Sequence, residues 1–229
     1  MKTSRTLLLP ALCLGILAGL TGLGFAAEAK GKAATTDETG ERLVFQTDWK
    51  GERIALPPAF APAMKLKGIE EIRFAPGMFQ AQSESFFSYA FVFSVTMDQE
   101  LTPAVIQLEM LVYYRGLAES VLKSKGKSVE SGKFTFKLER AKQATGAPEQ
   151  LPASTLVTQY AGELDWVEPF VTGKPQVLHF EIQSWTMPST ARNYLFVCTS
   201  PKARVETEAV WKELRTIRRR FEVKSQPGK

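Results

Sequence analysis

A histidine and several acidic side chains could meet on one face of a predicted sheet. His179, Glu181 and Trp185 share one side of the alternating segment 177–185. Glu163 and Asp165 end the preceding predicted strand, so they come close to His179 if the two strands pair. A histidine within reach of a carboxylate can act as a general base. The alternative, which we favour, is a solvent-facing strand surface on which the histidine has no catalytic role.

The small number of histidines and cysteines excludes most enzymes that depend on them. His179 is the only histidine, and Cys13 and Cys198 are the only cysteines. Structural zinc sites need four nitrogen or sulfur ligands, and the usual serine and thiol hydrolases need a histidine base. The sequence patterns of P-loops, nucleophile elbows and zinc proteases are also absent. We therefore expect neither a metal nor a cofactor, and carboxylate-based hydrolysis is the catalytic class left open.

Two further groups of side chains are candidates for binding a ligand or a partner. Trp166 and Trp185 lie at predicted strand ends, where an indole can contact a ligand, although tryptophans there more often seal a core. Arg218, Arg219 and Arg220 come near the end of a predicted helix. They could bind lipid phosphates or an acidic partner, or they could simply complement the negative end of the helix dipole. We expect Arg218 and Arg220 to project outward.

The first 29 residues have the three-part pattern of a secretory signal. Lys2 and Arg5 precede an uncharged apolar run over 7–23, and small residues follow as far as Ala29. We predict a signal peptide over 1–29, cleavage near Ala29, and a secreted or periplasmic location in the cell envelope. An uncleaved N-terminal anchor is the alternative, because the apolar run is about long enough to span a bilayer.

The charge balance gives no indication of a nucleic-acid partner. The chain has 29 basic and 24 acidic residues, a formal net charge of +5. Such a small excess would favour retention near an anionic surface, but it does not indicate a nucleic-acid binder. The expected partner is therefore an unknown envelope protein or an anionic surface. No second apolar stretch predicts a membrane span after cleavage.

Local patterns predict the elements that would position these side chains. The strongest strand is 86–95, where alternate residues from Phe87 to Val95 are large and apolar. Core packing of this face is favoured over an aromatic ligand platform. Thr102-Pro103 predicts the start of a helix and Gly126 its end. Further strands are predicted at 43–45, 70–74, 134–138, 156–166, 177–185 and 194–198, and a second helix at 204–222.

The order of these elements predicts an α+β domain over 42–224, preceded by a flexible tether at 30–41 and followed by a disordered tail at 225–229. Strands and helices do not alternate strictly, which favours a mainly antiparallel sheet with two packed helices. In element order, and in Tyr194-Leu195-Phe196-Val197 followed by a helix closing at Phe221, the chain resembles the PsbP-like sandwich. The alternative is a helix-grip fold, in which a sheet curls around a long C-terminal helix.

Three classes of function remain open at this point. We favour an exported, non-catalytic accessory or binding protein whose ligand the sequence does not identify. A carrier of an apolar ligand is the second class, and its enclosed pocket would be lined by the large residues between Phe87 and Phe93. A carboxylate-based hydrolase is the third, and it would present two carboxylates to one cleft. The character of the largest pocket distinguishes these three classes.

Overall fold

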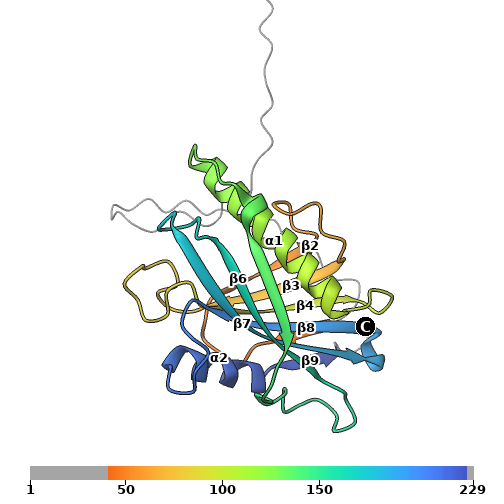
Figure 1. Ribbon diagram of the computed structural model, residues 1–229. Helices are drawn as coiled ribbons and strands as arrows, with labels where there is room; N and C mark the ends of the chain where they lie inside the picture. Colours follow the sequence, from red (N-terminus) through yellow and green to blue (C-terminus); the bar gives the residue numbers. More distant parts are fainter. Residues whose placement is uncertain (1–40, 226–229) are drawn as a thin grey trace, which may run out of the picture. The chain divides into compact units, whose positions relative to one another are not determined.

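The computed structural model describes residues 41–225. The predicted signal peptide at 1–29, the predicted tether up to residue 40 and the chain end at 226–229 lie outside the described residues. Within 41–225, strands and helices follow one another in an order that leaves the longest helix near the middle of the chain and a short helix near its end (Figure 1).

Seven antiparallel strands form a central sheet in the order β2-β3-β4-β8-β7-β6-β5. Their bounds are Gly51–Leu56 (β2), Gly68–Phe74 (β3), Tyr89–Thr96 (β4), Thr135–Arg140 (β5), Thr158–Val167 (β6), Pro175–Met187 (β7) and Arg192–Ser200 (β8). A separate two-stranded sheet pairs β1, Glu41–Val44, with β9, Glu222–Ser225. The predicted α+β class, with a mainly antiparallel sheet and two helices, is confirmed.

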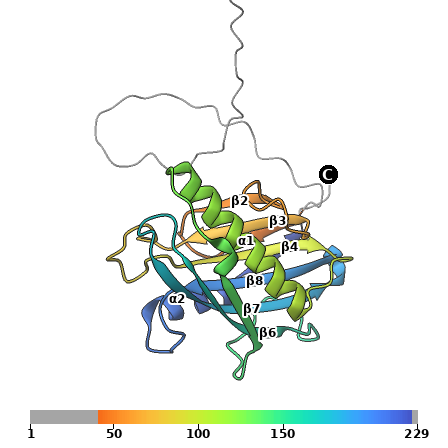
Figure 2. The same ribbon diagram turned by 45° about the horizontal axis from the view of Figure 1, so that its top comes forward.

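One helix packs on each face of the central sheet (Figures 1 and 2). On β4, Phe91 and Phe93 join the hydrophobic core that includes Tyr113 of the helix α1, Pro103–Ser124. Ala90 and Val92, which alternate with them, join the core around the helix α2, Ala209–Arg219. The predicted alternation is therefore confirmed from Tyr89 to Val95, and the sheet separates two cores. The prediction was wrong for Phe86 and Phe87, which precede β4 and both pack in the α1-side core, where Phe87 has a φ of 48°.

The start and end of α1 follow from local sequence chemistry. Thr102 has extended backbone dihedrals, and its hydroxyl accepts a hydrogen bond from the backbone N–H of Val105 at 3.2 Å. Pro103 takes the first helical position, where no intrahelical N–H is needed. At the other end Gly126 has a φ of 68°, and Lys127 N donates to the carbonyl of Leu122 at 2.8 Å. Both predicted ends of this helix are confirmed.

The second helix is shorter than the predicted span 204–222. Arg204 lies before it, and its guanidinium contacts Glu163 at 3.5 Å, which ties the preceding segment to β6. At the C-terminal end Phe221 leaves the helix and packs its ring 5.1 Å from both Phe45 and Phe196. The chain then continues as β9, so long-range packing and pairing end the helix before its apolar periodicity does.

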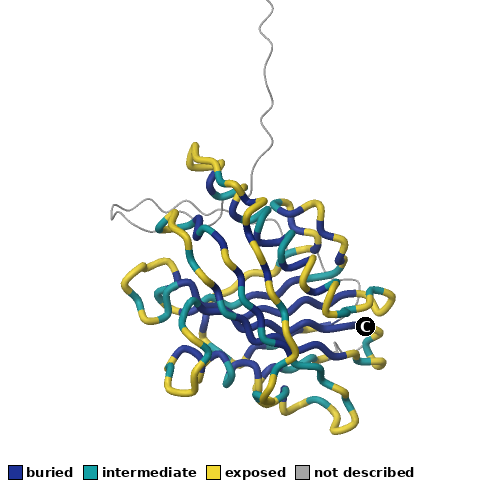
Figure 3. The backbone as a smooth tube through the Cα atoms, in the orientation of Figure 1, coloured by how far each residue is buried: buried dark blue, intermediate teal, exposed yellow. Residues whose placement is uncertain are grey.

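Burial is greatest along the central strands, as the dark segments of Figure 3 show. Every residue of β8 and seven of the eight in β4 are buried. The edge strand β2 is mostly exposed and was not predicted, because its charged, short sequence has no apolar alternation. Neither helix in the described range combines the length and the apolar character that crossing a bilayer requires.

Candidate functional site

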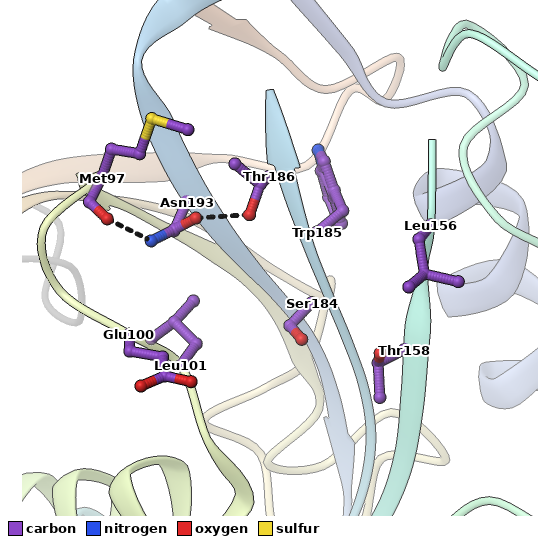
Figure 4. A pocket seen from close by; sticks show the side chains of 9 residues that line it. All are labelled: Met97, Glu100, Leu101, Leu156, Thr158, Ser184, Trp185, Thr186 and Asn193. Atoms are coloured by element: carbon purple, nitrogen blue, oxygen red, sulfur yellow. Dashed lines mark hydrogen bonds between the residues drawn. The ribbon is translucent and has the colours of Figure 1, made fainter. Parts of the chain in front are cut away.

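An open groove of about 410 Å³ lies on the α1 face of the sheet, close to the start of α1 (Figure 4). It is bounded by the segment between β4 and α1 on one side and by the beginning of β6 on the other. Its lining residues are Met97, Glu100, Leu101, Leu156, Thr158, Ser184, Trp185, Thr186 and Asn193.

The floor of the groove consists of polar side chains that are paired across the neighbouring strands β6, β7 and β8. Ser184 of β7 lies opposite Thr158 of β6, and Thr186 lies opposite Asn193 of β8. Along β7 the alternation on this face stays apolar up to Ile182, which belongs to the α1-side core, and then becomes polar. This break in the alternation is the sequence signal that could have located the groove, and our sequence analysis missed it.

One wall of the groove is held in place by two amide side chains. Asn193 donates through Nδ2 to the carbonyls of Met97, at 3.2 Å, and Gln99, at 2.9 Å, while its Oδ1 accepts from Thr186 Oγ1 at 2.6 Å. Gln99 in turn donates to the carbonyl of Lys67 at 3.0 Å and accepts from its N–H at 2.6 Å. The segment between β4 and α1 is thereby fixed to β8 and to Lys67, the residue before β3. A ligand would meet a preformed wall.

The chemistry of the lining suits hydrogen bonding rather than acid–base catalysis. The hydroxyl-bearing Thr158 and Ser184 belong to the floor, whereas Leu156, which is 84% exposed, forms an apolar rim. Glu100 is the only carboxylate among the nine lining residues. The groove therefore offers neutral polar groups flanked by apolar side chains, the combination by which binding sites orient a ligand.

The expected proximity of His179 and Glu163 is present, but the pair lies away from the groove. Glu163 and His179 are directly opposite each other on β6 and β7, with 3.3 Å between Oε1 and Nδ1. Glu163 also contacts Arg204 and is 46% exposed, so water screens this cluster. Asp165 is instead hydrogen-bonded to Thr135 at 3.1 Å. These residues lie on the α2 side of the sheet, opposite the face that carries the groove.

Glu181 is buried under α2 and is not part of a solvent-facing strand surface. Its Oε1 accepts from Arg215 Nε at 2.9 Å and Nη2 at 2.6 Å, and its Oε2 accepts from Arg218 Nη1 at 2.8 Å. Burial alone would raise the pKa of Glu181, but the two guanidinium groups outweigh it and hold the pKa below its ordinary value. Glu181 is therefore a buried anchor for α2, and the exposed-surface interpretation was wrong for it.

The outward projection expected for Arg218 was also wrong. Arg218 is 0% exposed, and besides Glu181 it donates to the carbonyl of Thr145. It follows Leu214 by four residues, so the helix places both side chains on the buried face. Arg219 and Arg220 are exposed. The predicted patch of three arginines is therefore reduced to two.

The two candidate tryptophans are parts of the cores. Trp166 is buried on the α1 side, where its ring lies 5.3 Å from those of Phe87 and Tyr114. Trp185 is buried on the α2 side and stacks on Tyr194 at 5.4 Å. Trp185 also borders the groove. The structure thus brings together His179 and Glu163, and separately Glu181 and Arg218, but it does not unite the candidates in one site.

The remaining chemical candidate is the thiol of Cys198. It is fully buried in β8, and burial raises its pKa to about 12, which leaves it protonated and unreactive. Among residues 41–225, no cluster of three or more His, Cys, Asp and Glu side chains is arranged to hold a metal ion.

Comparison of the chain with protein-family models, with curated proteins and with solved structures finds no match. The function proposed below therefore rests on the leader pattern in the sequence, the groove and the surface.

Proposed function

We propose that the chain is an exported, non-catalytic binding or accessory protein whose groove takes an extended segment of an envelope protein. The leader pattern over 1–29 supports export. The preformed groove, with its neutral polar floor and apolar rim, is the observation that carries the binding role. Its volume of about 410 Å³ falls within the usual range for ligand sites, roughly 300–1,000 Å³.

An extended peptide matches this lining better than a charged or wholly apolar ligand. Its backbone offers a donor and an acceptor at every residue, which the hydroxyls of Thr158 and Ser184 can complement. Its side chains alternate outward toward apolar contacts such as Leu101 and Leu156. Recognition of this kind takes affinity from main-chain hydrogen bonds and specificity from alternate side chains.

The two alternative functions have weaker geometric support. A carrier of apolar ligands would use the aromatic face of β4, but Phe91 and Phe93 pack against each other at 5.0 Å and against Tyr113 of α1 at 6.2 and 5.9 Å. The helix would have to leave the sheet to open a cavity there. A carboxylate-based hydrolase needs two acids on one cleft, and Glu100 is the sole acid among the nine residues lining the groove.

Within the α+β class we favour the PsbP-like sandwich over the helix-grip fold. A helix-grip sheet curls around one long C-terminal helix, whereas α2 has 11 residues. The longer helix, α1, has 22 residues and packs on the opposite face. Helices on both faces of an antiparallel sheet, with the second helix following the central strand β8, support the sandwich.

Photo-crosslinking in the cell envelope tests the binding role. A photoreactive p-benzoylphenylalanine replaces Leu156 on the groove rim, and the matched control replaces Val177, which is 40% exposed on the other side of the sheet. We expect the probe at 156 to link to one continuous segment of an envelope protein, and a second substitution, Thr158→Arg, to abolish the link. Equal adducts from both positions, or adducts to lipid or glycan alone, would contradict the proposal.

A further inference from the structure

The loop between β6 and β7 is built around a buried carboxylate. Glu168 is 0% exposed, and its side chain accepts hydrogen bonds from the backbone N–H groups of Phe170, Val171 and Thr172. The loop is closed by Gly173 N donating to the carbonyl of Glu168 at 2.9 Å. The hydrogen-bonding capacity of the Glu168 carboxylate is therefore used within the loop, and the bonds fix the backbone that carries Phe170 and Val171.

This rigid loop presents apolar side chains next to a second loop, between β3 and β4. Val171 is 42% exposed, and Phe79 of the second loop is 39% exposed. The rings of Phe79 and Phe170 lie 5.7 Å apart, and Phe170 rests on the buried Phe87 at the same distance. We call Phe79, Phe170 and Val171 the aromatic tip. Figures 1 and 2 show the β6–β7 loop near the C-terminal end of α1 and the β3–β4 loop at the same end of the sheet. The groove residues Ser184 and Thr186 lie toward the other end of β7.

The surroundings of the aromatic tip are basic. Lys125, in the turn that ends α1, donates through Nζ to the carbonyl of Pro169 at 2.8 Å and to that of Phe170, which joins the helix end to the loop. Lys123, Lys127 and Lys174 are exposed at the same helix end and in the same loop. Among the acids of the two tip loops, Glu168 is bound by backbone N–H groups and Glu84 is paired with Lys202 at 2.6 Å.

We propose that the aromatic tip and these lysines form a docking surface for an anionic lipid bilayer. The apolar side chains enter the interfacial region while the ammonium groups contact lipid phosphates. Charge complementarity supports lipid as the occupant, because the basic side chains surround the apolar ones. Three apolar side chains also offer far less than the roughly 1,000 Å² that a stable protein interface buries. The proposal is independent of what the groove binds.

The test uses the full chain and vesicles of phosphatidylglycerol and phosphatidylcholine, with phosphatidylcholine vesicles for comparison. The lysine variant, Lys123→Gln with Lys127→Gln and Lys174→Gln, removes three charges and leaves Lys125 to hold the loop. Its matched control, Lys212→Gln with Arg219→Gln and Arg220→Gln, removes three exposed charges along α2. At low salt we expect the lysine variant to bind anionic vesicles about a hundredfold more weakly, or about fivefold per lysine. The control should bind nearly as well as the parent.

A second measurement separates the tip from the N-terminal leader, which is common to all variants. Amide hydrogen exchange over residues 76–88 of the full chain should slow when anionic vesicles are added, and it should not slow in Phe79→Ser with Val171→Ser. Unchanged exchange at 76–88 in the parent would overturn the proposal, whatever the leader binds. Equal losses of binding in the lysine variant and its control would also overturn it. Protection by a lipid-free envelope extract but not by vesicles would assign the surface to a protein instead.

Discussion

Replacing Glu70 with glutamine should remove a large pH dependence of stability. Glu70 is 0% exposed in β3; Tyr113 Oη donates to its Oε1 at 3.1 Å, while Oε2 has no hydrogen-bond partner among the described residues. Burial raises the pKa of Glu70 from 4.5 to about 8, Tyr113 lowers it in part, and Glu52 on β2 raises it further. The folded protein therefore holds a proton on Glu70 at neutral pH, which the unfolded chain releases.

The sign and size of the effect follow from this difference between the folded and the unfolded pKa. Because the folded pKa is the higher one, the contribution to stability is complete below pH 4.5 and is lost as the pH rises through about 8. At about 1.36 kcal/mol per pKa unit, the parent should lose ~3.5 kcal/mol of unfolding free energy between about pH 5 and pH 8 through this group. The Glu70→Gln variant should not show this loss of unfolding free energy.

Urea denaturation at several pH values between these limits measures the difference between the parent and the variant. Glu71→Gln is the matched control, because Glu71 is the next residue along β3 but is ion-paired with Arg73 at 2.8 Å. The unfolding free energy of Glu71→Gln should therefore fall with pH over this range as it does in the parent. If the parent and Glu70→Gln lose equal unfolding free energy between about pH 5 and pH 8, Glu70 is ionised in the folded protein. The inference from its burial and its unpaired Oε2 would then be wrong.

Four other predictions concern the cores, the histidine and the leader. Arg218→Met should lower the unfolding free energy, measured by chemical denaturation, by about 3–5 kcal/mol, because it removes one partner of the buried Glu181. Arg219→Met, at an exposed site, should change it by less than about 0.5 kcal/mol. Phe91→Ala should cost about 3–5 kcal/mol in the same assay, and a loss under about 1 kcal/mol would contradict its place in the core. His179→Gln should leave crosslinking at Leu156 unchanged, since the two residues lie on opposite faces; a tenfold loss would reopen a role for the histidine. N-terminal sequencing of the exported protein should begin near Lys30, and a full-length, membrane-bound product would contradict cleavage.

Elements whose signals are local could be predicted from the sequence. The cap at Thr102 and the glycine at 126 each depend on a few neighbouring residues, and they mark α1 correctly. The alternation through Phe91 and Phe93 likewise needs no knowledge of the rest of the chain. Pairing of consecutive strands then placed Glu163 opposite His179, as expected.

Features that depend on distant partners could not be predicted in this way. The strand β9 exists because it pairs with β1 from the other end of the described chain. The burial of Arg218 depends on Glu181, which comes from β7. A helical pattern alone does not show that α2 covers this part of β7. The sequence analysis therefore placed Glu181 on an exposed strand face and Arg218 on an exposed helix face, although the two form a buried ion pair. The Glu168 loop was missed for the same reason, because its aromatic neighbour Phe79 comes from another loop.

The two proposed surfaces lie at opposite ends of the same strands, which restricts how the chain could sit at a membrane. Along β7 the aromatic tip lies beyond Pro175 and the groove includes Ser184 and Thr186. At roughly 3.3 Å per residue the two surfaces are therefore about 30 Å apart. A bilayer that meets the tip would leave the groove facing away from lipid, where the segment of an envelope protein can reach it.

The first described residue lies at the groove end of the sheet. Glu41 accepts hydrogen bonds there from Ser94, at 3.0 Å, and from Tyr194. A retained N-terminal anchor in the same bilayer would have to cover the distance from the groove end to the tip with residues 30–40, which reach about 36–40 Å when fully extended. The separation of about 30 Å between the two surfaces is within that reach. Docking through the aromatic tip is therefore compatible in length with either a cleaved leader or a retained anchor, and the sequencing and vesicle experiments test these two parts of the arrangement separately.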